Sequence, residues 1–352
     1  MSVRIALLGA GEWGQLHASV LADLPGVDFA VVCDPDLSRA RHVAGPLGAD
    51  STEDATTVLE DASVDAVVIA SPEDVHASQA ESALKSGKHA LVEKPVALMS
   101  DDAWHLVHVA RETSRILMPG HILRFVPAYA AVREQLSDLS DHTKVHSFFA
   151  RRNVPATRFS GHQRTHTALM SLAHDLDLLL WYLDGQEPER VYAVERRTLP
   201  GMGNPDIFWG IVEFSGGTVA CIESLWTIPP GGSRYVDVEL ELSTDKGFIK
   251  VRNPDDAVTL VRDDKTSHPA VSLDLQVGGH RFGALREELL HFLALVRGDV
   301  KRPLVTVEDA ARVIDLAEML ICSAQHGTPI AAADKPSIVG GSDRSKGVPD
   351  RG

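Results

Sequence analysis

The chain has 352 residues, of which 44% are hydrophobic and 24% are charged. This composition is that of a globular protein, and the length exceeds what one ordinary core needs, so we expect roughly two domains. The formal net charge of −15 argues against nucleic acid or an anionic membrane surface as a partner.

The three cysteines, Cys33, Cys221 and Cys322, are widely spaced and form no Cys-x-x-Cys pair. Reduced thiols in a cytoplasmic protein account for them. A strand pattern begins at the N-terminus and leaves no room for a signal peptide, and no apolar run approaches membrane-spanning length. We therefore expect a cytoplasmic protein that contacts no membrane.

The first third of the chain alternates apolar runs with stretches of helical spacing. This pattern predicts a parallel sheet with helices on both faces, a doubly wound Rossmann arrangement. The expected strands are Val3–Leu8, Phe29–Cys33, Val64–Ala70, His89–Val92 and Ile116–Met118.

From about Lys144 the rhythm changes to consecutive strands with short links, which predicts a large, mostly antiparallel sheet. The turns at Ser215-Gly216-Gly217 and 244–247 suit hairpins. The expected strands are Lys144–Val154, Arg190–Leu199, Asp206–Ser215, Thr218–Ile228, Tyr235–Thr244, Phe248–Arg252 and Val258–Arg262; the expected helices are Thr167–Leu183, Gly283–Arg297 and Val307–His326.

The predicted fold class is therefore α/β, with an N-terminal Rossmann domain over residues 1–124 and a C-terminal α+β domain with an open sheet over 125–330. The tail from 331 to 352 is rich in Gly, Ser, Pro and charge, and we expect it to be disordered.

The first predicted strand runs into a G-x-G-x-x-G sequence at residues 9–14. Gly9 permits a tight turn, Gly11 lets the backbone approach a pyrophosphate, and Gly14 allows close packing of helix on strand. The amides at the start of that helix would bind the phosphates. An ordinary strand–turn–helix is the alternative, but the acidic residue expected at the end of the second strand is also present.

That acidic residue is Asp34, which should accept hydrogen bonds from a ribose diol and repel a 2′-phosphate. We therefore predict NAD in preference to NADP. Arg39 could turn towards a phosphate, so NADP remains the alternative cofactor.

The tripeptide Glu93-Lys94-Pro95 closes a later predicted strand. The carboxyl ends of such strands face the crevice in which a dinucleotide lies, and a residue before proline is restricted to extended geometry. A lysine amine held beside a nicotinamide indicates redox chemistry on a hydroxyl or carbonyl group.

Up to about Ile330 the chain resembles the glucose–fructose oxidoreductase, inositol dehydrogenase and MocA-like (Gfo/Idh/MocA) oxidoreductases. The family pairs a Rossmann domain with an open-sheet domain whose face often forms the oligomer contact, and its members mostly oxidise or reduce a hydroxyl of a sugar, polyol or nucleotide sugar. The resemblance rests on residues 9–14, Ala70-Ser71-Pro72 with His76, Glu93-Lys94-Pro95, Gly120–Pro127, His174-Asp175-Leu176-Asp177 and Trp226.

The resemblance implies roles for individual side chains. The cofactor-binding candidates are Gly9, Gly11, Glu12, Trp13, Gly14, Asp34, Arg39, Ser71, Pro72, His76, Glu93 and Lys94. The substrate-binding candidates are Lys94, His121, Arg124, Arg158, His174, Asp177 and Trp226.

His174 is the candidate acid–base residue, because an imidazole suits removal of a hydroxyl proton while hydride leaves the same carbon. Lys94 would stabilise the developing alkoxide. In one continuous helix, Met170, His174, Asp177 and Trp181 point roughly together. Many relatives carry an aspartate at the position of Met170; methionine cannot stabilise imidazolium, so we expect a proton relay that is altered or shared with Asp177.

Two further groups have weaker interpretations. His162, His166 and His174 loosely imitate a metal site, but their polar flanks favour a substrate-side loop, and we predict no metal. A cluster of arginines, Arg151, Arg152 and Arg158, could meet an anionic substrate group or form a solvated charge cluster.

The sequence thus predicts an NAD-linked oxidoreductase that acts on a small sugar or polyol. An NAD-dependent glycosidase on the same scaffold and a catalytically silent NAD-binding regulator remain alternatives. A sheet face without helices needs a cover, which favours a homodimer or homotetramer through the C-terminal sheet.

Overall fold

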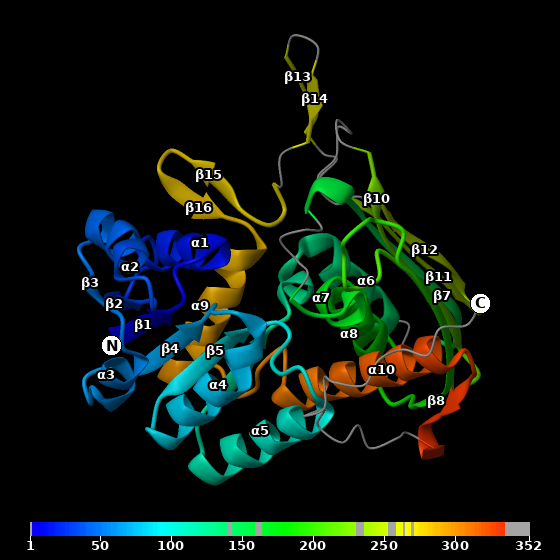
Figure 1. Ribbon diagram of the computed structural model, residues 1–352, viewed down its shortest axis with the longest axis horizontal. Helices are drawn as coiled ribbons and strands as arrows, with labels where there is room; N and C mark the ends of the chain where they lie inside the picture. Colours follow the sequence, from blue (N-terminus) through cyan, green and yellow to red (C-terminus); the bar gives the residue numbers. More distant parts are fainter. Residues whose placement is uncertain are drawn as a thin grey trace.

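The computed structural model describes residues 2–138, 143–158, 164–229, 236–252, 258–262, 265–268 and 271–334. Figure 1 shows two sheets with their helices side by side, and the Rossmann half lies on the left of that view. The predicted fold class is confirmed.

The N-terminal sheet has six parallel strands in the order β3-β2-β1-β4-β5-β6, which is the Rossmann order. Its central strand β4 is completely buried, and β1 is buried except at Arg4, because helices cover both faces. The strands are β1 (Val3–Leu8), β2 (Val27–Cys33), β3 (Asp50–Thr52), β4 (Ala66–Ile69), β5 (His89–Glu93) and β6 (Leu117–Gly120); the helices are α1 (Glu12–Leu21), α2 (Leu37–Ala44), α3 (Ala55–Glu60), α4 (His76–Lys85) and α5 (Ser100–Thr113).

Strand β3 is the one strand of this sheet that the sequence did not predict. Its three residues, Asp50, Ser51 and Thr52, are polar and pair with β2 at the edge of the sheet. Because such a strand buries little apolar surface, it carries no hydrophobic signal.

The second sheet has seven strands in the order β12-β11-β7-β10-β9-β8-β17. Both predicted hairpins, β9–β10 and β11–β12, are antiparallel, whereas β7 pairs with β10 in parallel. The strands are β7 (Val145–Pro155), β8 (Pro188–Arg196), β9 (Ile207–Phe214), β10 (Val219–Ile228), β11 (Asp237–Thr244), β12 (Gly247–Arg252) and β17 (Ile330–Ala331).

Helices cover one face of this sheet (Figure 1), and they are α6 (Pro127–Asp138), α8 (Ala173–Tyr182) and α10 (Val307–His326). Along the strands, buried and accessible residues alternate, as expected for a sheet with one packed face. The outer face carries Tyr192, Trp209, Ile211 and Val219, each 39–46% exposed.

The single helix predicted over Thr167–Leu183 is wrong. The structure has two helices, α7 (Thr167–Met170) and α8, with Ser171 and Leu172 between them. The break falls between Met170 and His174, so the argument that these two residues share one helical face does not hold.

Several segments differ from the simple two-part division. Helix α9 (Ala284–Arg297), expected in the C-terminal domain, packs against α1 and β1. The predicted strand Val258–Arg262 becomes β13 (Leu260–Arg262), which pairs with β14 (Lys265–Ser267) apart from the main sheet, and a second small hairpin joins β15 (Leu275–Val277) to β16 (His280–Phe282). Beyond β17 a short turn ends at Asp334, and the rest of the predicted tail lies outside the described residues.

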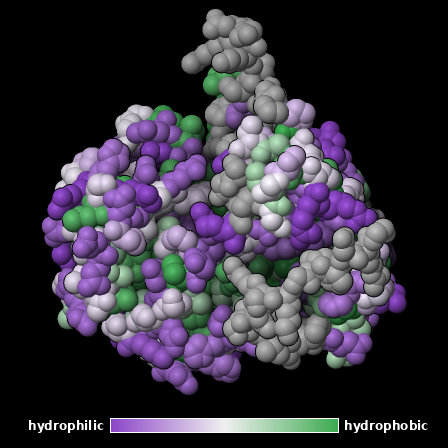
Figure 2. All heavy atoms as spheres, in the orientation of Figure 1, coloured by the Kyte–Doolittle hydropathy of each residue, from purple (hydrophilic) through white to green (hydrophobic). Residues whose placement is uncertain are grey.

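Within the described ranges, no helix is long and apolar enough to cross a membrane. Hydrophilic residues predominate on the face shown in Figure 2, and hydrophobic residues there form small groups.

Candidate active site

A cleft of about 310 Å³ lies at the carboxyl ends of β1, β2, β4 and β5. The strand order reverses between β1 and β4, which is where ligands bind in such sheets. The cleft brings together most of the predicted cofactor residues: Gly9, Gly11, Glu12, Trp13, Asp34, Arg39, Ser71, Pro72, His76, Glu93 and Lys94. Arg158 and Met170 reach it from the second domain.

The glycine turn is as close-packed as its motif implies. Gly9 has φ +98°, and a Cβ there would lie 2.6 Å from the backbone of Ala70. A Cβ on Gly14 would lie 2.0 Å from the carbonyl oxygen of Gly9. At Gly11, by contrast, a Cβ would meet nothing within 4 Å, so this backbone is open to the cleft. The turn therefore packs tightly on its inner side and leaves a gap for a ligand on the other.

Asp34 is 6% exposed and is tied into this turn. Its carboxylate accepts hydrogen bonds from the amides of Ala10 and Asp36, both at 2.9 Å. Arg39 lies 4.0 Å from the same carboxylate. The carboxylate of Asp34 therefore lines the cleft in a fixed position, and the charge of Arg39 partly offsets its own.

His76 joins two loops that border the cleft. Its ring lies between the carbonyl oxygens of Pro95 and Ser71, 2.8 Å from each. Ser71 in turn donates from its hydroxyl to Gln79. The buried imidazole therefore fixes the turn after β4 relative to the turn after β5.

The carboxylate of Glu93 bonds to His17, whose Nε2 donates to one of its oxygens at 2.7 Å. Burial opposes ionisation of Glu93, but the His17 contact and the Lys94 charge outweigh it and lower the pKa of Glu93. Nearby, Glu288 on α9 is completely buried, and neither of its oxygens has a partner among the described residues. Burial and the charge of Glu93 raise the pKa of Glu288 well above its ordinary value.

Lys94 lies at the point where the two domains meet. Its Nζ donates to the carbonyl oxygen of Met170 at 2.9 Å, and the Met170 sulfur is 3.9 Å away. Burial lowers the pKa of Lys94, while Glu93 and Glu73 oppose that shift. The ammonium is thus poorly solvated, which suits a group that stabilises a developing negative charge.

His174 is half-buried on α8 and is not among the residues that line the cleft. Burial lowers the pKa of His174 well below its ordinary value, and the charges of Lys94, Arg152 and His121 act in the same direction. Its Nδ1 is buried and has no hydrogen-bond partner in the described part of the chain. The ring is therefore a neutral base rather than an imidazolium at neutral pH.

Arg152 is paired with Asp175, the residue after His174. The guanidinium donates two bonds to that carboxylate, at 2.7 and 3.0 Å. Asp175 is 1% exposed, so the pair is a buried brace between β7 and α8. Of the predicted arginine cluster, Arg151 pairs with Asp237 on the sheet, and only Arg158 reaches the cleft.

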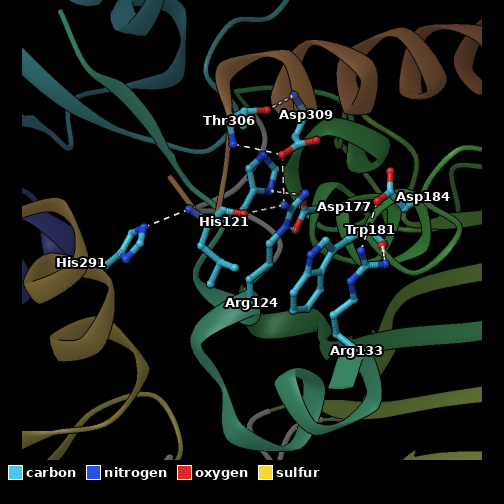
Figure 3. Close-up of polar contacts among 10 residues, drawn as sticks. His121, Arg124, Arg133, Asp177, Trp181, Asp184, His291, Thr306 and Asp309 are labelled. Atoms are coloured by element: carbon cyan, nitrogen blue, oxygen red, sulfur yellow. Dashed lines mark hydrogen bonds and ion pairs between the residues drawn. The ribbon is translucent and has the colours of Figure 1, made fainter. Parts of the chain in front are cut away.

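Arg124 and Asp177 are buried and bonded to one another, at 3.0 and 2.7 Å. Figure 3 shows the Arg124 guanidinium between Asp177 and Asp309, with the Trp181 ring 5.2 Å away. His121 lies beside this pair, with Nδ1 3.7 Å from an Asp177 oxygen. With Asp309, these residues form a network that joins η3 (Ile122–Phe125), α8 and α10, and none of them lines the cleft.

Trp226 is 3% exposed and packs with Val154 and Met170 in a small cluster separate from the main core. His166 caps α7 and bonds to Glu195 at 2.9 Å. His162 lies outside the described residues. Within the described ranges, no group of three or more His, Cys, Asp or Glu side chains could hold a metal ion.

The sequence did not single out the ion pair of Glu73 and Arg164, which crosses the cleft between the two domains with bonds of 2.8 and 2.9 Å. Both residues line the cleft. Glu73 directly follows the Ser71-Pro72 motif, so the sequence indicated only that Glu73 would lie near the cleft. Nothing in the sequence spacing could have indicated its partner 91 residues away.

Two sequence profiles match this chain. Residues 3–121 match the profile described as "Oxidoreductase family, NAD-binding Rossmann fold" of the Gfo/Idh/MocA proteins. Residues 132–250 match the profile of a Gfo/Idh/MocA C-terminal domain.

Curated relatives and solved structures agree with this. The chain is 29% identical over 346 residues to scyllo-inositol 2-dehydrogenase (NAD(+)) of Bacillus subtilis, covering 96% of this chain and 98% of that protein. It is 30% identical over 253 residues to inositol 2-dehydrogenase of Rubrobacter xylanophilus, covering 71% of each. The structure of scyllo-inositol dehydrogenase from Lactobacillus casei, with bound NAD(H) and scyllo-inositol, superposes with a TM-score of 0.80 at 21% identity over 95% of this chain and 100% of that one. The chain therefore belongs to the Gfo/Idh/MocA family of oxidoreductases, which has an NAD-binding Rossmann domain.

Proposed function

We propose that this oxidoreductase removes hydride from a hydroxyl-bearing carbon of a polyol or sugar, with NAD as the acceptor. The observation that carries the proposal is the position of Lys94, at the carboxyl end of β5 and bonded across the domain boundary to Met170. The inositol dehydrogenases among the relatives favour a cyclic polyol as substrate.

The glycine turn fits a dinucleotide. The open backbone at Gly11 and the N-terminus of α1 would receive the pyrophosphate, and Asp34 would accept from the ribose hydroxyls. When bound, NAD supplies the hydride acceptor. Ser71, Pro72, His76 and Glu93 line the same cleft and would border the nicotinamide.

Lys94 would donate to the reacting oxygen and stabilise it as alkoxide, because its ammonium is partly stripped of water and already points across the cleft. His174 would take the hydroxyl proton on its ring, since burial and the neighbouring cations lower the pKa of that ring and leave it able to accept. Arg158 lines the cleft from the second domain and would contact a substrate hydroxyl or the cofactor phosphates.

His121, Arg124, Asp177 and Trp226 are buried, and we infer that they act through their neighbours. Arg124 and Asp177 already satisfy one another's charge and hydrogen bonds. We therefore infer that they position α8 rather than contact the substrate directly. Trp226 packs on Met170 and would set the position of the carbonyl to which Lys94 is bonded.

The test is to incubate the purified protein with NAD and a panel of polyols that includes myo-inositol and scyllo-inositol. Steady formation of NADH is expected with at least one cyclic polyol. Release of sugar from a glycoside without net NADH would instead indicate the glycosidase. Tight NAD binding with no turnover on any compound would indicate the silent regulator and would overturn the proposal.

We also infer a homo-oligomer through the outer face of the second sheet. Tyr192, Trp209, Ile211 and Val219 lie on adjacent strands of that face, with Tyr192 and Ile211 paired in register. Further across the sheet, beyond β7, β11 and β12 carry charged residues, with Arg252 and Lys250 bonded to Glu239. An apolar area with a polar border is typical of a subunit interface, and a second copy of this chain is the occupant that we propose.

A further inference from the structure

The start of α1 places a negative charge at the end of the cleft where phosphates would bind. Glu12 is the first residue of that helix and lines the cleft. The cap residue Gly11 offers the amides of the first turn no side-chain acceptor, so these amides suit a phosphate. The carboxylate of Glu12 nevertheless repels the negative charges of a pyrophosphate. A cation near Glu12 would therefore favour binding of the cofactor.

Most of the cations around the cleft are held by other groups. The lysine and arginines that line it, among the described residues, are Arg39, Lys94, Arg158 and Arg164. Arg39 lies 4.0 Å from the carboxylate of Asp34, and Arg164 donates two hydrogen bonds to Glu73. Lys94 donates to a backbone carbonyl oxygen of α7. These contacts direct three of the positive charges to other parts of the cleft.

Arg158 shares the cleft with Glu12 and responds to its charge. It follows the end of β7 at Pro155 and reaches the cleft from the second domain. The residue is half-buried; burial lowers the pKa of Arg158, and the charge of Glu12 opposes that shift. A guanidinium that has lost part of its water interacts strongly with an anion, and its planar fork matches two phosphate oxygens.

We propose that Arg158 binds the pyrophosphate of NAD, so that the second domain completes the phosphate site of the Rossmann domain. The guanidinium offsets the charge of Glu12 and adds charged donors to the amides of α1. The amides belong to the first domain and Arg158 to the second, so a bound pyrophosphate joins the two. This assignment deepens the proposed function, because it gives Arg158 to the cofactor rather than to a substrate hydroxyl, and it rests on that function only for the NAD site.

The test is calorimetric binding of NAD and of ADP-ribose, which contains the pyrophosphate but lacks the nicotinamide, to the full-length protein. Arg158→Gln should weaken both on the order of ten- to a hundredfold, because a charge-assisted contact is lost. Arg158→Lys keeps the charge without the fork and should lose less. Adenosine has no phosphate and should bind the unmodified protein and both variants alike, which also shows that the variants are folded.

The matched control is Arg190→Gln. It removes an arginine that bonds to Glu213 on the second sheet, and it should bind NAD and ADP-ribose like the unmodified protein. Equal ADP-ribose affinity in Arg158→Gln and the unmodified protein would overturn the proposal. A raised KM for the polyol alone would then assign Arg158 to the substrate.

A second pair of variants separates a direct contact from an effect through Glu12. Glu12→Gln alone should strengthen ADP-ribose binding, because a repulsive charge is lost. In the Glu12→Gln background, Arg158→Gln should still weaken ADP-ribose binding, since the contact with the pyrophosphate is lost as well. No loss in that background would mean that Arg158 only neutralises Glu12, and the proposed contact would be wrong.

None of these binding measurements needs turnover. A protein that binds NAD but oxidises no polyol therefore contradicts the proposed function, while the ADP-ribose affinities still decide the role of Arg158.

Discussion

Lys94 and Met170 meet where the two domains join, with the lysine Nζ 2.9 Å from the methionine carbonyl oxygen. A backbone carbonyl carries only a partial negative charge, so it orients the ammonium without neutralising it. The ammonium of Lys94 is therefore oriented in a poorly solvated place, which suits stabilisation of an alkoxide.

The first prediction concerns this lysine. Lys94→Ala should lower turnover on the order of a hundredfold or more, because one well-placed donor is lost from the transition state. NAD affinity should change little, since the contacts proposed for Gly11 and Asp34 are with the other half of the cofactor. The measurements are kcat on the best polyol and NAD binding by calorimetry.

Lys85→Ala is the matched control, because that lysine lies on the surface of α4 and bonds only to Glu81 among the described residues. Lys85→Ala should leave both kcat and NAD affinity unaltered. If Lys94→Ala abolishes NAD binding, the lysine is a cofactor anchor. Full turnover in Lys94→Ala would remove it from the mechanism.

The second prediction concerns cofactor choice. Asp34→Ser should weaken NAD binding and narrow the preference for NAD over NADP, because the ribose diol loses an acceptor and a 2′-phosphate loses a repulsive charge. Asp28→Ser is the control, because Asp28 lies on β2, the strand that leads to Asp34, and its side chain is 50% exposed. The measurement is kcat/KM with each cofactor. An unmodified protein that uses NADP as well as NAD would contradict the role of Asp34.

The fold of the first domain was predictable because its signals are local. Four of the five expected strands there were apolar runs of four to seven residues, bounded by turns, and the glycine motif carries its own mechanical reasons. The cleft followed from the rule that ligands bind where the strand order reverses. Most of the cofactor candidates therefore came together around the cleft as expected.

The environment of His174 was not predictable, since it depends on partners far apart in the chain. Arg152 bonds to Asp175 and Arg124 to Asp177 over separations of 23 and 53 residues. Periodicity also could not reveal the helix break after Met170, because Thr167–Tyr182 contains no glycine or proline and reads as one segment. The sequence therefore identified candidate side chains but not which acid each base would face.

The third prediction concerns Glu288, a buried acid without a partner in the described ranges. With a raised pKa, it keeps its proton after the unfolded chain has released one, so folding stability falls as pH rises above the ordinary glutamate pKa of about 4.3. Glu288→Gln cannot ionise and should be more stable than the unmodified protein near neutral pH, by about 1–3 kcal/mol.

Urea unfolding at acidic and neutral pH measures this difference. The advantage of Glu288→Gln should shrink towards about pH 4, where the unfolded chain also becomes protonated. Glu287→Gln, the neighbouring residue on α9, is the control. An advantage that does not vary with pH would show that Glu288 titrates normally.

The fourth prediction tests the proposed subunit interface. Trp209→Glu places a charge in the apolar part of the outer sheet face, and it should shift the protein towards monomer. Val277→Glu changes an exposed apolar residue on the β15–β16 hairpin and serves as the control. Analytical ultracentrifugation gives the mass of each. If Trp209→Glu sediments like the unmodified protein, the interface does not include this face.

The last prediction concerns the ion pair that crosses the cleft. Arg164 belongs to the second domain and Glu73 to the turn after β4, and two hydrogen bonds join them beside the glycine turn. Glu73 is largely buried, and its pKa is lowered because Arg164 outweighs the effect of burial. Breaking the pair should therefore loosen the two domains at the point where the cofactor enters.

Arg164→Ala should raise the rate of NAD dissociation several-fold, while the rate of the chemical step in a single turnover should stay close to that of the unmodified protein. Arg190→Ala removes a matched bidentate pair with Glu213 on the surface of the distant sheet, and it should change neither rate. Stopped-flow release of NADH measures dissociation. Urea unfolding of Arg164→Ala and Arg190→Ala separates an effect on NAD dissociation from a general loss of stability. Equal dissociation rates in Arg164→Ala and Arg190→Ala would mean that the pair does not retain the cofactor.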